Sequence, residues 1–284
     1  MSEQNIFTEN DEREIVKRTI KDSVFSDLFG NKGNLLQLYK RFHPEDTAVS
    51  EEDLKDITIE NVLVDDIYND LGVLVKDNFM IFVEAQSTWS YNILIRVILY
   101  LSKTYKEYFD RQNIDLYTSA KAKMPKPEIY VVYTGNRKDR PETINLTEHF
   151  FDGNKADIDV TAHMIYESDG SDILNQYIIF TKVFDEQRNL FGRTKDAILE
   201  TIKICKDRNI LRDYLTDKEQ EVINMMMDLY DQEYIMRSRD NGKAREQAIE
   251  MIKDGILTDE KIAQYTKLRL DFIKDLRKEI MQTI

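Results

Sequence analysis

The sequence predicts an α/β protein in which a mixed sheet, flanked by helices, is followed by an all-helical C-terminal region. Two neighbouring apolar runs, at 71–76 and 79–85, are separated by a short polar turn and predict a β-hairpin. Residues 91–109 place apolar side chains at helical spacing directly after this hairpin. From about residue 171 onward the pattern is helical throughout. These three observations favour helices packed on one central sheet.

The elements on either side of the hairpin follow from the same two periodicities. Apolar residues near helical spacing predict helices over 11–28 and 33–42. The segment TIENVLVDDIYND, residues 58–70, mixes β-branched residues with acids and is ambiguous. The remaining segments before residue 171 are a basic loop or short helix at 111–127, a buried central strand at 128–135, and strand or loop material at 143–150 and 158–166.

The C-terminal region is predicted to begin with a long charged helix that runs to Gly242 or beyond, followed by short helices with a break at Gly255. We therefore expect a sheet-containing domain over 1–190 and a helical region over 191–284. The last helix, 269–279, has helix-turn-helix character, but its four bases and three acids give a net charge of only +1. Assembly or partner binding therefore explains this region at least as well as DNA reading does.

Charge is distributed unevenly along the chain. The formal net charge of -13 argues against a surface coated with basic patches for non-specific DNA binding. Residues 51–78 hold nine acids and two bases, whereas residues 95–140 hold ten bases and five acids. An acidic stretch followed by a basic one is compatible with a metal site beside a phosphate track. Chance distribution over solvated surfaces is the alternative interpretation.

The sequence predicts a cytoplasmic protein with no membrane span. No run of 18 apolar residues occurs, and the polar N-terminus lacks the apolar core of a signal peptide. The single cysteine, Cys205, cannot form an intrachain disulfide, which favours a reducing compartment. His43, His149 and His163 are scattered without metal-ligand spacing, so we expect no structural zinc site.

The hairpin carries two acids at positions where the apolar pattern makes a charge costly. Asp70 leads the first strand and Glu84 lies near the end of the second. Antiparallel pairing about a turn centred near 77.5 places Asp70 within one residue of Glu84. Two adjacent carboxylates repel, and Mg²⁺ or Mn²⁺ between them removes the repulsion. Gln86, two residues beyond Glu84, shares its face of the strand, so we expect a metal-dependent hydrolytic site.

This constellation resembles the PD-(D/E)XK nuclease superfamily, and more narrowly its branch of recombination-promoting nucleases and putative transposases. The resemblance lies in YNDLGVLV, MIFVEAQSTWS, NILIRVILYLSKTY and PEIYVVYTG and covers about 50–135. It implies a restriction-endonuclease-like fold with metal ligands at Asp70 and Glu84. Gln86 takes the place of the superfamily lysine, a departure that removes a positive charge. Arg96 on the following helix is the residue we expect to supply that charge.

The predicted function is that of a Mg²⁺-dependent DNA endonuclease, with Asp70, Glu84, Gln86 and Arg96 as its catalytic residues. The resemblance extends this to recombination, mobile elements or defence against foreign DNA. The long helical tail has apolar side chains to bury, and we expect a homodimer or higher oligomer. The alternative is a catalytically degenerate nuclease fold that acts as a DNA- or protein-binding module, which the neutral Gln86 and the acidic chain favour.

Several other residues have both a functional and a structural interpretation. Trp89 is a candidate for stacking on a base, although a packed aromatic at the start of the helix is the better explanation. Tyr100 and Tyr105 have the spacing of core residues. His149 and His163 have no partner pattern, and an ordinary structural role is expected for both.

Overall fold

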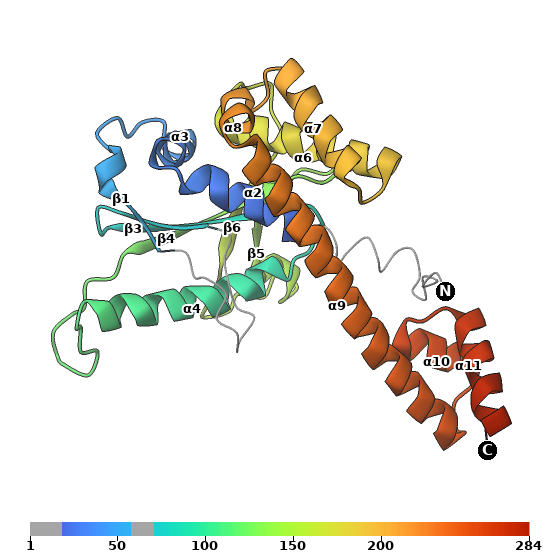
Figure 1. Cartoon of the computed structure of the whole chain (residues 1–284). Helices are drawn as coiled ribbons and strands as arrows, with labels where there is room; N and C mark the ends of the chain where they lie inside the picture. Colours follow the sequence, from blue (N-terminus) through green and yellow to red (C-terminus); the bar gives the residue numbers. More distant parts are fainter. Residues whose placement is uncertain (1–18, 58–70, 284) are drawn as a thin grey trace. The chain divides into compact units, whose positions relative to one another are not determined.

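The computed structural model describes residues 19–57 and 71–283 of the chain (Figure 1). Its first half holds the sheet and the helices around it. These elements are, in order, α2 Thr19–Gly30, α3 Lys32–Phe42, the 3₁₀ turn η1 Glu51–Asp53, β1 Leu54–Asp56, β2 Leu71–Val75, β3 Phe79–Gln86, α4 Ile93–Arg111, β4 Lys126–Tyr133, β5 Thr143–Asn145, α5 Leu146–His149 and β6 Thr161–Ile165. The helices that follow are α6 Ile173–Phe191, α7 Lys195–Asp207, α8 Arg212–Asp217, α9 Glu219–Asp254, α10 Asp259–Thr266 and α11 Leu270–Thr283.

The described strands form one mixed sheet of 6 strands in the order β1-β2-β3-β4-β6-β5. β2 and β3 are the predicted hairpin, with Val75 opposite Phe79 and Leu71 opposite Val83. This register centres the turn on Asp77, half a residue earlier than the sequence suggested. Lys76 and Asp77 have φ of 48° and 56°, left-handed values that suit the tight reversal of a hairpin. β3, β4 and β6 run parallel, so their carboxyl ends lie at one edge of the sheet.

Helices cover both faces of the sheet (Figure 1). On one face α4 packs against Phe82 and Val131, and Tyr100 from the middle of the helix is fully buried there. On the opposite face α3 packs against Val73, Ile81 and Val83 of the hairpin. α2 and α6 lie beyond α3, joined by the rings of Phe25 and Tyr177, whose centroids are 5.1 Å apart. Burial on both faces explains why β2 and β4 are continuous apolar runs rather than alternating ones.

The predicted α/β class, hairpin, central strand and long helix are confirmed by the structure. α4 begins and ends two residues later than expected, and the 143–150 and 158–166 segments contain β5, α5 and β6. The sequence did not predict β1, which is only three residues long and pairs with β2 at the edge of the sheet. Such a strand is too short to show an alternating pattern.

The chain divides into two compact units, one over 21–224 and the other formed mainly by 225–284. The predicted boundary at 190/191 falls at the C-terminal end of α6, inside the first unit. α7 and α8 therefore belong to the same unit as the sheet. In the second unit α10 and α11 pack with the last turns of α9 around Ala248, Ile262 and Ile273. No helix among the residues described is long and apolar enough to cross a membrane.

Candidate functional site

Glu84 is a buried carboxylate in the second strand of the hairpin. Successive side chains of a strand point to opposite faces, so residues 82, 84 and 86 share the face of β3 that α4 covers. Phe82 contacts Tyr100 of that helix, with 5.4 Å between the ring centroids. Glu84 itself lies opposite Val131 of β4 and is only 4% exposed. A charge this deep in a sheet is costly unless other groups compensate it. The position of Glu84 is therefore the first feature of the structure that calls for a functional explanation.

The guanidinium of Arg96 lies beside Glu84. Its Nη2 lies 3.6 Å from Glu84 Oε2 and donates a hydrogen bond of 3.2 Å to Gln86 Oε1. The Arg96 side chain is 43% exposed, so its guanidinium contacts both the buried carboxylate and the solvent. The three residues come together because α4 begins seven residues after β3 ends and packs back on the same face.

Gln86 is held in place by the loop that precedes α4. Its Nε2 donates to the carbonyl oxygens of Thr88 and Ser90, so the amide nitrogen fixes the turn and the amide oxygen faces Arg96. The backbone carbonyl of Gln86 accepts from Thr134 N at 2.9 Å, which extends the parallel pairing of β3 and β4 beyond the strands. Gln86 is thus a positioned hydrogen-bonding group rather than a mobile surface amide.

Asp70, the second predicted metal ligand, lies outside the described residues. Its chain neighbour Leu71 pairs with Val83, which is the chain neighbour of Glu84. Within residues 19–57 and 71–283, no group of three or more His, Cys, Asp or Glu side chains has the arrangement of a metal site. A metal site at Glu84 thus depends on Asp70, and the pairing of the two stays a prediction.

A row of three aromatic rings with an arginine at each end lies at the edge of the sheet where β3, β4 and β6 end, next to Gln86. We name it the Arg–aromatic row; it consists of Arg137, Trp89, Tyr133, Tyr166 and Arg140. Arg137 Cζ is 4.0 Å from the centre of the Trp89 ring, and Arg140 Cζ is 5.6 Å from that of Tyr166. Tyr133, which pairs with Gln86, joins the two ends of the row.

Sequence reasoning missed the Arg–aromatic row. Trp89 was expected to be a packed aromatic, which it is, but the residue on its face comes from a loop 48 positions later in the chain. The available signal was the basic segment 95–140, which contains Arg96, Arg137 and Arg140. Of the other candidates, Tyr100 and Tyr105 are buried core residues as predicted. The His149 ring packs at 4.1 Å against that of Tyr91 and Nδ1 contacts the Asn145 carbonyl, both structural contacts.

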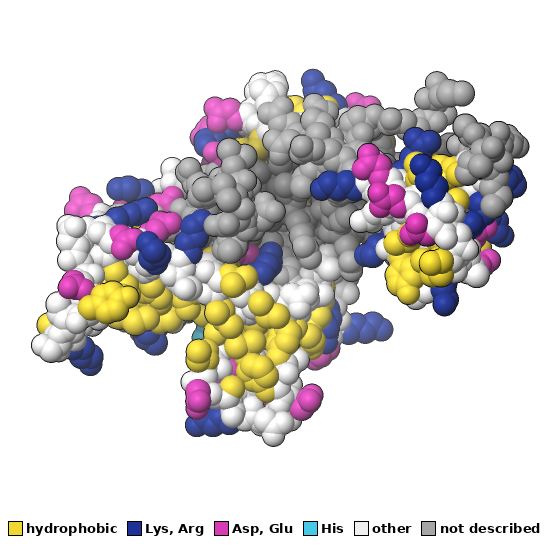
Figure 2. All heavy atoms as spheres, turned by 90° about the horizontal axis from the view of Figure 1, so that it is seen from below, with side chains coloured by type: hydrophobic (Ala, Val, Ile, Leu, Met, Phe, Trp, Pro, Cys, Tyr) yellow, Lys and Arg dark blue, Asp and Glu magenta, His cyan; other side chains and the backbone are white. Residues whose placement is uncertain are grey.

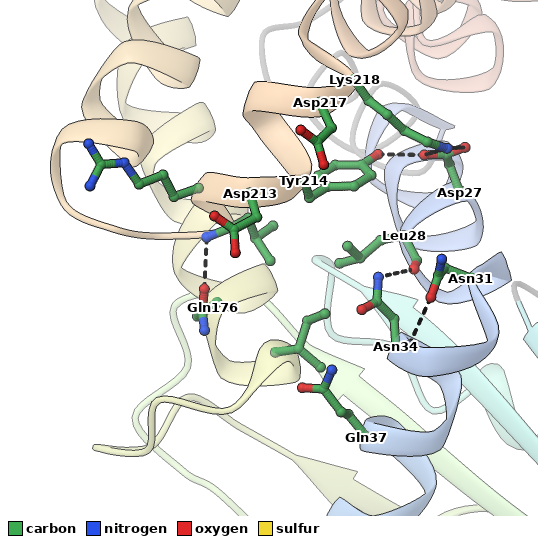
Figure 3. A pocket seen from close by; sticks show the side chains of 13 residues that line it. Asp27, Leu28, Asn31, Asn34, Gln37, Gln176, Asp213, Tyr214, Asp217 and Lys218 are labelled. Carbon is green, nitrogen blue, oxygen red and sulfur yellow. Dashed lines mark hydrogen bonds and ion pairs between the residues drawn. The ribbon is translucent and has the colours of Figure 1, made fainter. Parts of the chain in front are cut away.

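A separate polar pocket of about 390 Å³ lies between α2, α3, α6 and α8, and contains none of the predicted site residues (Figure 3). On its wall Asp27 accepts hydrogen bonds of 2.8 Å from the Tyr214 hydroxyl and from Lys218 Nζ. Gln176 accepts from the backbone nitrogen of Leu211, whose left-handed φ of 47° is unusual for a leucine. These contacts tie α8 to α2 and α6, which makes stabilisation of the helical layer their evident role.

Comparisons with known proteins do not extend the resemblance seen in the sequence. No protein-family model matches the chain, and no match is found among curated proteins or among solved structures.

Proposed function

We propose that the protein is a metal-dependent DNA endonuclease of the PD-(D/E)XK type, with Glu84 at its active site. The observation that carries this proposal is the 4% exposed carboxylate of Glu84, beside Gln86 and Arg96 on one face of the hairpin. The order α3, hairpin, α4, β4 supports it, because helix, hairpin, helix and strand is the order that the resemblance associates with the nuclease core. The biological setting proposed with it is recombination, mobile elements or defence.

The donor chemistry at Glu84 suits Mg²⁺ or Mn²⁺, which prefer carboxylate oxygens and tolerate partial hydration. Asp70 and Glu84 are the residues proposed to hold the ion. When bound, the ion would activate water and stabilise negative charge on a phosphodiester. The hydrogen-bonded Gln86 would orient water or a phosphate oxygen, and the partly exposed Arg96 would offset charge on the phosphate. Arg96 would then serve both the protein, by compensating Glu84, and the substrate.

The test is cleavage of supercoiled plasmid by the purified full-length protein in Mg²⁺, Mn²⁺ or EDTA. We expect nicking with either metal, none in EDTA, and loss of activity in Asp70→Ala and Glu84→Gln. Glu107→Gln is the matched control, because Glu107 is a carboxylate on α4 that pairs with Arg111 at the surface. Full cleavage in EDTA, or by the Glu84→Gln protein, would refute the proposed function.

The rival is a degenerate nuclease fold that binds a protein partner. Ile95 and Leu99, one turn apart on α4 and on either side of Arg96 in sequence, are 42% and 48% exposed. In Figure 2, hydrophobic side chains gather on the face of the molecule that α4 occupies. An apolar stripe of this kind is a common docking surface for another protein. Metal-dependent cleavage that survives Ile95→Ser and Leu99→Ser exchanges favours the nuclease, whereas an inert protein that loses self-association in these variants favours the rival.

A further inference from the structure

We propose that Arg137 and Arg140, each held against an aromatic ring, bind phosphates of a DNA strand and orient that strand across Glu84. The inference rests on the proposed function for the identity of the strand as DNA. It assigns the Arg–aromatic row a role in positioning substrate, which is distinct from the chemistry assigned to Glu84, Gln86 and Arg96.

The row is placed for this role by the topology of the sheet. Parallel strands end at one edge, and ligands of α/β sheets commonly bind in the crevice outside those carboxyl ends. Gln86 and Tyr133 are the paired last residues of β3 and β4. The Tyr133 ring lies 5.4 Å from that of Trp89 and 6.1 Å from that of Tyr166. The two arginines therefore lie at the two ends of a series of rings whose middle member, Tyr133, pairs with Gln86 of the candidate site.

The geometry of Arg137 suits a phosphate. Trp89 covers the flat face of the guanidinium at 4.0 Å and holds the group in place. Nε is buried, whereas Arg137 Nη2 donates to Asp139 Oδ2 at 2.9 Å and the side chain as a whole is 30% exposed. Asp139 is 73% exposed, so this ion pair contributes little and a phosphate can displace it. The phosphate would then accept a charge-assisted hydrogen bond from Nη2 in place of the Asp139 carboxylate.

Arg140 repeats the arrangement at the other end of the row. Its guanidinium lies over Tyr166, and its Nη1 donates to the Glu167 carbonyl oxygen at 3.4 Å. Two fixed positive charges separated by rings match a strand whose phosphates recur along its length and whose bases have apolar faces. The acidic chain carries a net charge of -13, so such local cations are where a DNA strand would be attracted.

The test measures DNA binding without cleavage, in EDTA, by fluorescence anisotropy of a labelled single-stranded oligonucleotide and of its duplex. We expect Arg137→Gln and Arg140→Gln each to weaken binding roughly tenfold and to lower the slope of log K against log salt by about one. Arg137→Lys keeps the charge but not the planar guanidinium that stacks on Trp89, and should bind with intermediate affinity. The control is Arg111→Gln, which removes an arginine that is also paired with an exposed carboxylate, but from the opposite end of α4.

Trp89 provides an independent readout because it is the only tryptophan in the chain. Its emission should change and saturate as the oligonucleotide is added to the wild-type protein. Variants that bind both DNA forms as the wild type does would overturn the proposal. So would inorganic phosphate that changes Trp89 emission as strongly as the oligonucleotide, since that identifies a small-anion site. A protein that binds DNA through these arginines but never cleaves it refutes the proposed nuclease and leaves this inference standing.

Discussion

Replacing Arg96 by methionine tests how the buried charge of Glu84 is compensated. The methionine keeps much of the apolar stem of arginine and removes the guanidinium, which lies 3.6 Å from Glu84 Oε2 and bonds to Gln86 Oε1. In the variant, a carboxylate that is 5% exposed loses the cation beside it. We expect the folded protein to be destabilised in the absence of divalent metal, because removing one partner of a buried pair leaves an uncompensated charge.

The size of the effect follows from the distance and the exposure. Coulomb's law gives about 1 kcal/mol for unit charges 3.6 Å apart in water and about 5 kcal/mol at an effective dielectric constant of about 20. Because the Arg96 side chain is 43% exposed, the value near the aqueous limit applies. Loss of the hydrogen bond to Gln86 adds about 1 kcal/mol. The expected destabilisation is therefore about 2 kcal/mol, or a Tm lowered by about 5 °C.

The assay is thermal unfolding of the wild type and the Arg96→Met protein, in EDTA and in excess Mg²⁺ or Mn²⁺. If Glu84 binds the ion, metal restores most of the lost stability, because the cation replaces the guanidinium. Arg111→Met is the control: its partner Glu107 is 40% exposed, so a change of at most about 0.5 kcal/mol is expected. An unchanged Tm in EDTA would refute compensation by Arg96. A lowered Tm that metal leaves unchanged would refute metal binding at Glu84.

Three further predictions concern the fold. Gly135→Ala should destabilise the protein by about 2 kcal/mol in denaturant unfolding, because the new Cβ would lie 2.2 Å from the Ser87 carbonyl oxygen, whereas Gly30→Ala meets no atom and should be nearly neutral. The pKa of Tyr214 is raised by burial and by its hydrogen bond to Asp27, so the stability that this environment gives is complete below about pH 10 and is lost as pH rises further. The Asp27→Asn protein should be less stable than the wild type at pH 8 and should lose less stability than the wild type between pH 8 and pH 11. Unfolding midpoints at the two pH values will show both differences. Removal of the second compact unit should leave the sheet folded. If that unit makes the predicted dimer, light scattering of the shortened protein should give the mass of a monomer. A shortened protein that is still dimeric would place the dimer contact elsewhere.

The hairpin and α4 were predictable because their signals are local. Two apolar runs joined by a polar turn specify a hairpin, and the turn centre fixes which residues meet across it. The turn is centred on Asp77, the middle residue of the KDN triplet and half a residue before the expected 77.5, because Val75 pairs with Phe79. Arg96 lies near Glu84 because it is in the first turn of α4, the helix that follows β3 along the chain.

What the sequence did not reveal depends on contacts between distant segments. Strands β1 and β5 have three residues each, too few for a pattern, and they exist because β2 and β6 offer edges to pair with. The division of the chain was also out of reach. α7 belongs to the unit that contains the sheet, and its apolar side chains, Ile198 and Ile202 among them, are buried there. Helical periodicity alone does not determine which unit a helix packs into.

The basic segment 95–140 shows why charge counts locate a site only after the strands are paired. Along the sequence, Arg96 and Arg137 are 41 positions apart, and neither has a recognisable motif. The parallel pairing of β3 with β4 places Gln86 opposite Tyr133, so the loop after β4 lies beside the loop after β3. That single register brings Arg137 onto Trp89 while α4 brings Arg96 to Glu84. An excess of five bases over 46 residues thereby becomes cations near the end of β3, the strand that carries the buried Glu84. It is this placement that makes the Arg137 and Arg96 variants informative about DNA.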